Sequence, residues 1–428
     1  MSHIELIACH ECDLLQRAVP IPAGGTLRCR RCNAELYRSH PNSLERALAL
    51  SLASFVLFIV SNVFPIVGLS VSGTHVNTTL FGSVRVLYLD GMWPIAGLVF
   101  ATTILMPALQ IGAMLWMLLP LRLHRVPWQA AQVFRVFHLA KPWGMTEVLI
   151  LGLLVALVKL AHIASIVPGE ALWSFGLLML VLAAASAAFD ERVLWSRISA
   201  VQSPGAEGNG GMALHGAASA AGHHLALCHD CGLLMKLPAH AHDLSCPRCG
   251  AMLHLRRPAS LSHTWAFLIA AMVLYIPANV LPVMYTSSLF GAQTDTIMSG
   301  VVYLWVSGSW SLAVIVFIAS VAVPMLKILA LSYLVISTQF HSHWLPEQRT
   351  RIYRLVEFVG RWSMLDIYVI TMLVALVQFQ ALATIKAGPA AIAFGAVVVL
   401  TMFAAMSFDP RLIWDEAEKN HAWTRTQQ

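Results

Sequence analysis

The chain contains one pattern twice: two Cys-x-x-Cys pairs followed by a long apolar region. All eight of its cysteines belong to these pairs. They form a first cluster of Cys9, Cys12, Cys29 and Cys32 and a second cluster of Cys228, Cys231, Cys246 and Cys249. Two such pairs place four soft donors around one point when a short hairpin brings them together. The pattern predicts two small four-cysteine zinc ribbons, one before each apolar region.

The cysteines have two other interpretations. Disulfides need an oxidising compartment, and no cleavable signal peptide is expected because Cys9 precedes every apolar run. The same four thiolates hold a single iron in rubredoxin-like electron carriers, and ligand type alone does not exclude iron. Zinc is favoured because no further cysteine or cofactor motif is available to pass an electron onward. His10 and His229 lie inside the pairs and are expected to be solvated, since four thiolates already fill the shell.

The residues that close the pairs differ between the clusters. Gly232 and Gly250 follow the pairs of the second cluster, where a left-handed backbone commonly closes the turn. Asp13 and Asn33 stand at these places in the first cluster. Because a left-handed conformation costs energy for residues other than glycine, we expect slight strain in the first ribbon.

The composition is that of a polytopic membrane protein. Hydrophobic residues make up 58% of the 428 residues, charged residues make up 11%, and the mean hydropathy is +0.71. A membrane crossing needs about 20 apolar residues. Eight membrane helices are expected, within Ala47–Gly68, Gly91–Leu121, Val148–Pro168, Ala171–Phe189, Pro258–Thr294, Trp310–Ile336, Ile367–Ile385 and Ala387–Phe408.

Basic residues indicate the orientation. If the N terminus is cytoplasmic, the inside segments hold 22 of the 27 Lys and Arg residues. By the positive-inside rule, both termini and both ribbons are then cytoplasmic. The sequence pI near 9.0 follows from this topology. No nucleic-acid partner is expected, because a basic stripe with interleaved aromatic residues is missing.

The repeat extends beyond the cysteines. Asn62-Val63-Phe64-Pro65 matches Asn279-Val280-Leu281-Pro282, and Phe189-Asp190-Glu191-Arg192 matches Phe408-Asp409-Pro410-Arg411. Four helices per unit make a parallel repeat, because both units then enter the membrane in the same sense. The predicted fold is therefore all-α, a tandem parallel repeat of two four-helix transmembrane bundles, and each ribbon is expected to belong to the bundle that follows it. The expected division is zinc ribbon 1 over residues 1–43, bundle 1 over 44–198, a flexible linker over 199–222, zinc ribbon 2 over 223–257, bundle 2 over 258–414 and a cytoplasmic tail over 415–428.

Ionisable residues inside the apolar regions are candidates for function, because a charge in lipid is costly. Lys159 and Lys327 fall within expected helices, and their repeat partners are Gln378 and Gln110. We hypothesise an intramembrane polar network of Lys327, Asp366, Ser363 and Thr401, to which Ser320, Lys159 and Glu147 can add. In the alternative, the lysines reach an interface and the two acidic residues only cap helices.

No catalytic constellation is present. The chain lacks the HExxH, GxSxG, Walker and Rossmann patterns, and we expect no enzyme activity and no ATP-driven pumping by this chain alone.

The whole pattern resembles the paraquat-inducible protein A family. The resemblance rests on the paired Cys-x-x-Cys ribbons, the N-V-[FL]-P and W-[GS]-M motifs, and the closing F-D-x-R, from Cys9 to Trp414. It implies an inner-membrane protein of Gram-negative bacteria that works beside a periplasmic MCE-domain tunnel protein and moves phospholipid across the envelope. It also implies zinc at the eight cysteines. Two other functions stay open: a membrane-bound redox or stress-response protein with iron sites, and a membrane scaffold for a periplasmic partner.

Overall fold

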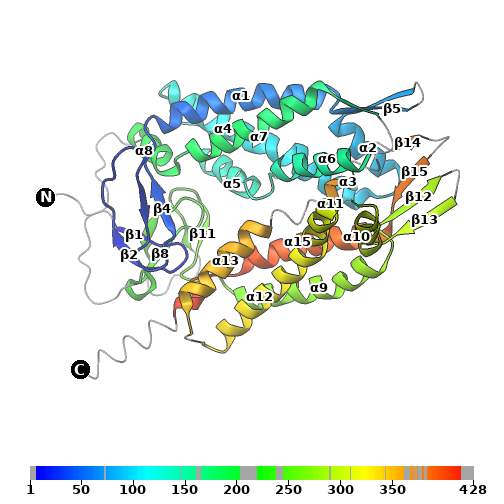
Figure 1. Cartoon of the computed structure of the whole chain (residues 1–428). Coiled ribbons are helices and arrows are strands. Elements are labelled where there is room, and N and C mark those ends of the chain that lie inside the picture. Colours follow the sequence, from blue (N-terminus) through cyan, green and yellow to red (C-terminus); the bar gives the residue numbers. More distant parts are fainter. Residues whose placement is uncertain are drawn as a thin grey trace.

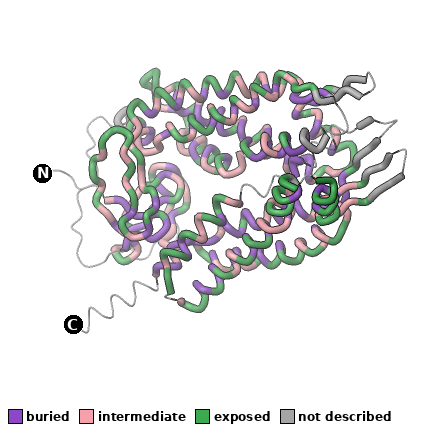
Figure 2. The backbone as a smooth tube through the Cα atoms, in the orientation of Figure 1, coloured by how far each residue is buried: buried purple, intermediate pink, exposed green. Residues whose placement is uncertain are grey.

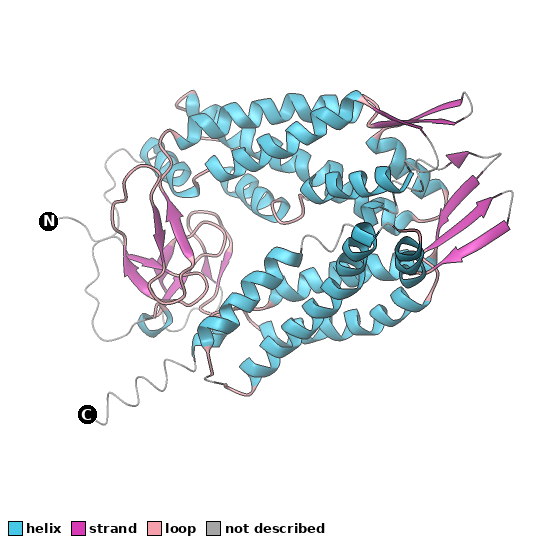
Figure 3. Cartoon of the chain, in the orientation of Figure 1, coloured by secondary structure: helices cyan, strands magenta, loops and turns pink. Residues whose placement is uncertain are grey.

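The protein is elongated, with cysteine-bearing sheets at one end and larger hairpin sheets at the other (Figure 1, Figure 3). We call these the ribbon end and the hairpin end. The computed structural model describes residues 6–71, 74–144, 146–160, 165–202, 219–237, 244–288, 291–308, 310–342, 344–360, 367–369, 371, 374, 378–379 and 383–415.

Two ribbons of short antiparallel hairpins form the ribbon end. Ribbon 1 contains β1 (Leu6–Ala8), β2 (Leu15–Arg17), β3 (Thr26–Arg28) and β4 (Glu35–Arg38). Ribbon 2 contains β8 (Leu225–Leu227), β9 (Leu234–Lys236), β10 (Leu244–Ser245) and β11 (Met252–Leu253), and the short helix η2 (Ala221–His223) precedes it. In each ribbon, the first two strands pair with each other and the last two pair with each other.

The first half, residues 43–202, follows ribbon 1. Its elements are α1 (Ser43–Val63), β5 (Val67–Val71), β6 (Thr74–Thr78), α2 (Leu80–Leu89), α3 (Trp93–Phe100), the π-helical turn η1 (Ala101–Leu105), α4 (Met106–Arg122), α5 (Ala130–Ala140), α6 (Thr146–Leu160), β7 (Ser165–Pro168), α7 (Glu170–Ala188) and α8 (Glu191–Gln202). Because α8 continues to Gln202, the first four residues of the expected linker are helical. Residues 203–218 lie outside the described residues.

The second half, residues 260–415, largely follows the same order. Its elements are α9 (Ser260–Val280), β12 (Met284–Ser288), β13 (Gly291–Asp295), α10 (Ile297–Val306), α11 (Trp310–Phe317), the π-helical turn η3 (Ile318–Ala322), α12 (Val323–Gln339), α13 (Pro346–Gly360), β14 (Gln378–Phe379), β15 (Ala383–Ala387) and α15 (Pro389–Ser407).

Apolar side chains cover the outside of the long helices. Only 22% of an 18-residue apolar stretch of α1 is buried inside the protein. Leu52, Val56 and Ile59 on this helix are about half exposed, and Figure 2 shows exposed residues along its length. An apolar surface of this extent is typical of contact with lipid. The chain is a multi-pass membrane protein.

Six helices of the described residues are long and apolar enough to cross a membrane, fewer than the eight expected. The expected spans Val148–Pro168 and Ile367–Ile385 are wrong as continuous membrane helices. In the first, α6 has 15 residues and is followed by β7, and in the second, β14 and most of β15 replace helix. Both segments were predicted from hydropathy, which does not distinguish a short buried helix from a strand.

The prediction of an all-α fold is also wrong at the hairpin end. Strands β6, β5 and β7 form a three-stranded sheet, and β13, β12, β15 and β14 form a four-stranded sheet. In the first sheet, β5 pairs with both β6 and β7, so the chain returns to the hairpin end between α5 and α7. The segment expected to be the third membrane helix therefore contains a short helix and a strand.

The N-V-[FL]-P motifs end α1 and α9 and bring the backbone close to a glycine. A proline disfavours helix in the preceding residue, and Phe64 before Pro65 is extended. The carbonyl of Pro65 then accepts a hydrogen bond from the Ala171 amide at 3.2 Å. A Cβ on Gly169 would lie 2.1 Å from the same carbonyl oxygen. No side chain fits at this contact.

The second half repeats this contact. The carbonyl of Pro282 accepts a hydrogen bond from the Ala390 amide at 3.2 Å, and a Cβ on Gly388 would lie 2.2 Å from it. The asparagines that open the two motifs satisfy the backbone, as the side chain of Asn279 shows by donating to the Tyr275 carbonyl at 2.8 Å.

Each half also has a π-helical turn directly before the dipeptide Met106-Pro107 or Val323-Pro324. A proline inside a helix lacks an amide hydrogen, and its ring collides with the carbonyl four residues earlier. Widening the preceding turn relieves this collision, which accounts for the same irregularity at matching places.

The halves meet in the middle of the molecule along α3, η1 and α15. Ile95, Val99 and Phe394 are buried in a core that both halves share. The Tyr368 hydroxyl donates to Thr102 Oγ1 in η1 at 2.9 Å.

The two close glycine contacts give a test of the fold. We expect Gly388→Ala to destabilise the protein by about 1–3 kcal/mol, because the added methyl group would displace backbone rather than a flexible side chain. The matched control is Gly300→Ala on α10, where a Cβ meets no atom within 4 Å. Thermal unfolding of the purified variants measures the difference, and equal midpoints for the two variants would contradict the assigned contact.

Candidate metal centres and intramembrane polar residues

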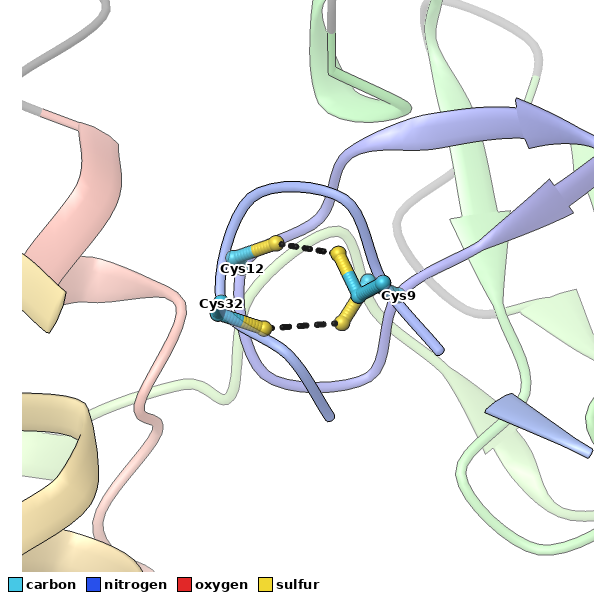
Figure 4. Close-up of side chains that lie close together, drawn as sticks. Cys9, Cys12 and Cys32 are labelled. Carbon is cyan, nitrogen blue, oxygen red and sulfur yellow. Dashed lines mark hydrogen bonds between the residues drawn. The ribbon is translucent and has the colours of Figure 1, made fainter. Parts of the chain in front are cut away.

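Ribbon 1 brings its four thiols to one point. Their Sγ atoms all lie within 4.8 Å of one another. The closest pairs are Cys9 with Cys32 and Cys12 with Cys29, each 3.5 Å apart. In Figure 4, Cys9, Cys12 and Cys32 direct their sulfurs toward a common centre. The four side chains are buried.

Ribbon 2 has the same arrangement. Cys228 and Cys249 are 3.4 Å apart at their sulfurs, and Cys231 and Cys246 are 3.5 Å apart. The turn that forms each pair is closed by backbone hydrogen bonds, such as the one from the Gly232 amide to the Cys228 carbonyl at 3.0 Å. The ribbons therefore place the predicted ligands as the spacing required.

The donor sets fit a tetrahedral metal ion. Four thiolates about 2.3 Å from a zinc ion would be about 3.8 Å apart. A disulfide needs about 2.05 Å between sulfurs, and all eight cysteines are free. A bound ion would cross-link the two hairpins of a ribbon. In ribbon 1, the Gln16 side chain also donates to Cys29 Sγ at 3.2 Å.

Asp13 does more than replace a glycine. It is left-handed, with φ of 61°, as expected for the residue that closes a pair. Its buried carboxylate accepts hydrogen bonds from the Ala221 amide at 2.9 Å and from the Arg256 guanidinium at 3.0 Å. Arg256 also binds Asp415, which follows α15. Asp13 therefore links ribbon 1 to the segments on both sides of ribbon 2.

The buried core of ribbon 1 packs against the second half of the chain. Its four cysteines share a cluster with Leu331, Leu334 and Phe408. Arg354 on α13 forms an ion pair with the buried Glu11 and donates to the Cys32 carbonyl at 2.7 Å. The prediction that each ribbon belongs to the bundle that follows it is wrong for this core.

Ribbon 2 packs in the opposite direction, against the first half. Its four cysteines share a cluster with Met117 on α4, Phe134 and Phe137 on α5, and Trp195 on α8. The guanidinium of Arg248 lies 5.9 Å from the centre of the Trp195 ring. The ribbons are thus exchanged between the two halves.

The arginines of the F-D-x-R motifs join each ribbon to its own half. Arg192 lies 4.4 Å above the ring of Tyr37 in ribbon 1. Arg411 binds Asp409 and donates to the His229 ring at 2.9 Å, while His229 remains exposed as expected. Desolvation by the surrounding protein and the charge of Arg411 lower the pKa of His229. Burial alone would raise the pKa of Asp409, but hydrogen bonds from Arg411 lower it to about 2.

Lys327 is the clearest polar feature within the membrane helices. It is 2% exposed and lies near the middle of the span Ala313–Gln339. Its ammonium group has no hydrogen-bond partner within the described part of the chain. At the matching place in the first half, Gln110 donates to Ser186 on α7 at 2.9 Å. The counterpart of Ser186 is Ala405, whose side chain cannot accept a hydrogen bond from Lys327.

The other residues of the hypothesised network divide into two groups. Thr401 and Ser320 are buried, and each hydroxyl donates to a carbonyl of its own helix, at 2.9 and 2.6 Å. Glu147 is exposed in the first turn of α6. The remaining members, Asp366, Ser363 and the side chain of Lys159, lie outside the described residues.

Sequence reasoning missed Asp13, Arg256 and Arg354 as residues that assemble the ribbons. The only signal was the Asp that replaces glycine at a left-handed position. No local sequence pattern around Arg354 identifies its partner Glu11, which lies 343 residues away in the sequence.

Together, the spans and the sites define a multi-pass membrane protein with two four-cysteine ribbons at one end. The family described as paraquat-inducible protein A matches residues 44–199 and, again, residues 261–418. The chain belongs to the paraquat-inducible protein A family.

Three relatives cover nearly the whole chain. The chain is 34% identical to the intermembrane transport protein PqiA of Escherichia coli (strain K12) over 423 residues, which are 97% of each chain. It is 29% identical over 414 residues to the lipophilic envelope-spanning tunnel protein A of the same strain, covering 97% of this chain and 92% of the relative. It is 26% identical over 419 residues, 96% of each chain, to a probable intermembrane transport protein of Haemophilus influenzae. No solved structure matches significantly.

The role of Asp13 can be tested by restoring the glycine of the second ribbon. We expect Asp13→Gly to lower the free energy of unfolding by about 1–3 kcal/mol, because Ala221 and Arg256 lose a charged acceptor. Metal content should not change. In the control Asn33→Gly, the same backbone conformation, with φ of 60°, gains freedom without losing a known contact, so no loss is expected. If both variants have wild-type thermal midpoints, the bridging role is contradicted.

Proposed function

We propose that the chain is an integral inner-membrane component of a bacterial envelope lipid transport system. It exchanges phospholipid between the inner membrane and a periplasmic MCE-domain tunnel protein. The observation that carries the proposal is the similarity along nearly the whole chain to proteins named for intermembrane transport and for a lipophilic envelope-spanning tunnel. The apolar outer surface of the long helices supports residence among lipids.

The proposed orientation places the ribbon end and both termini in the cytoplasm and the hairpin end in the periplasm. The support is the concentration of Lys and Arg in the ribbons and in the segments beside them. The sheets at the hairpin end then face the periplasmic partner. The proposed units remain two bundles with four passages each, and in the first half the third passage would consist of α6 and β7.

The proposed function is tested by isolating the chain together with its periplasmic partner. Mass spectrometry of the purified complex should find phospholipid bound well above the amount that accompanies an unrelated polytopic membrane protein prepared in the same way. If the partner does not co-purify and the bound lipid equals that of the control, the transport proposal is rejected. A partner that binds without lipid enrichment would favour the scaffold alternative.

Each four-cysteine cluster is proposed to hold zinc. We expect metal analysis of colourless purified protein to find about two zinc ions per chain. Cys29→Ser should reduce this to about one, because the first cluster then lacks a thiolate. The control Gly300→Ala, on α10 at the hairpin end, should keep both ions. A red, iron-containing preparation would overturn the assignment and favour the redox alternative.

The intramembrane network is proposed to bias the conformation of the second half. In this hypothesis, one bundle opens a pocket to lipid, and protonation changes at Lys327 and Asp366 favour one state. The support is the burial of Lys327 and its lack of a hydrogen-bond partner in the described residues, which makes its charged form costly.

The network hypothesis predicts different outcomes for two substitutions. Lys327→Gln, which introduces the residue of the first half, should abolish function in a strain whose envelope integrity depends on this system. Lys327→Arg keeps the charge and should retain part of it. If Lys327→Ala and Asp366→Ala both accumulate normally and both support wild-type envelope integrity, the hypothesis is rejected.

A further inference from the structure

The exchange of the ribbons ties the two halves together at the ribbon end. Ribbon 1 is joined to α1 of the first half through residues 39–42, yet its buried core lies on the second half. Ribbon 2 is joined to α9 of the second half through residues 254–259, yet its core lies on the first half. Each ribbon is therefore covalently joined to one half and packed against the other, so the two ribbons form two crossed connections between the halves.

The connecting segments are too short to permit separation. Four residues reach at most about 14 Å and six residues about 21 Å when fully extended. While both ribbons remain docked, the ribbon ends of the two halves can move apart by no more than the slack in these segments. Docking is reinforced between the ribbons, because the Asp13 carbonyl accepts from the Ala220 amide at 2.9 Å.

The hairpin end has no comparable connection in the described residues. Its two sheets are separate, and no strand of β5–β7 pairs with a strand of β12–β15. Contacts between the halves in the middle of the molecule, such as Tyr368 with Thr102, lie between the two ends. The ribbon end therefore restricts movement of one half relative to the other more strongly than the hairpin end does.

We infer that the ribbons form a metal-dependent crossed clasp, in which loss of metal from one ribbon releases the half that does not follow it in the sequence. The strands of the ribbons have only two to four residues, and the cysteines themselves supply much of the buried core. Small domains of this kind depend on a bound metal for their fold. The clasp keeps the ribbon end closed, and relative movement of the halves is confined to the hairpin end.

Hydrogen exchange of the full chain tests the crossing. In Cys29→Ser/Cys32→Ser, exchange in α13 should become at least about tenfold faster, while α5 keeps its protection. In Cys246→Ser/Cys249→Ser, exchange in α5 should accelerate and α13 should keep its protection. Each variant is the control for the other. Loosening of the half that directly follows the altered ribbon, equal loosening of both halves, or no change in either would overturn the clasp.

A second variant tests the docking of ribbon 1 on the second half if loss of the cysteines prevents folding. Arg354→Gln leaves all eight cysteines in place and removes the ion pair between α13 and Glu11. We expect unchanged metal content and faster exchange in ribbon 1, without a change in ribbon 2. The matched control is Arg351→Gln, an exposed arginine one turn earlier on the same helix. The same exchange in both variants would contradict docking of ribbon 1 on the second half.

Discussion

The ribbon end depends on the convergence of four thiols in each ribbon. Strands of two to four residues cannot hold a stable hairpin alone. The proposed metal cross-link between the Cys-x-x-Cys pairs would therefore stabilise the shape of each ribbon. Each ribbon has a buried face, and that face lies on the half to which the ribbon is not directly joined. Two local metal cross-links would therefore organise contacts between distant parts of the chain.

Much of this architecture could be predicted from the sequence. The convergence of the eight thiols into two clusters was predicted correctly, because the spacing of the Cys-x-x-Cys pairs is a local property of the chain. The long helices were predicted because about 20 apolar residues have few alternatives in lipid. The break of the third expected helix into α6 and β7 was not predicted, because the two elements share one apolar run and β5, which pairs with β7, lies about 100 residues earlier. The exchange of the ribbons was missed for a related reason: adjacency in sequence suggested contact, whereas the contact depends on distant residues such as Arg354.

The irregular features are repeated as faithfully as the regular ones. In both halves, a proline follows the first helix, and a glycine leaves room for the carbonyl oxygen of that proline. A π-helical turn then precedes a second proline. The polar interior differs between the halves, since Gln110 has Ser186 as a partner while Lys327 lacks an equivalent one among the described residues. This difference in the polar interior is consistent with the proposal that the second half responds to protonation while both halves provide the frame.

The central functional claim is that this chain transfers phospholipid between its membrane and a periplasmic partner. Its most direct test is transfer of labelled phospholipid from vesicles containing the metal-loaded chain to the purified soluble partner. The account predicts transfer that requires both proteins and exceeds the spontaneous exchange from protein-free vesicles. Transfer that is equal with and without the chain would contradict it.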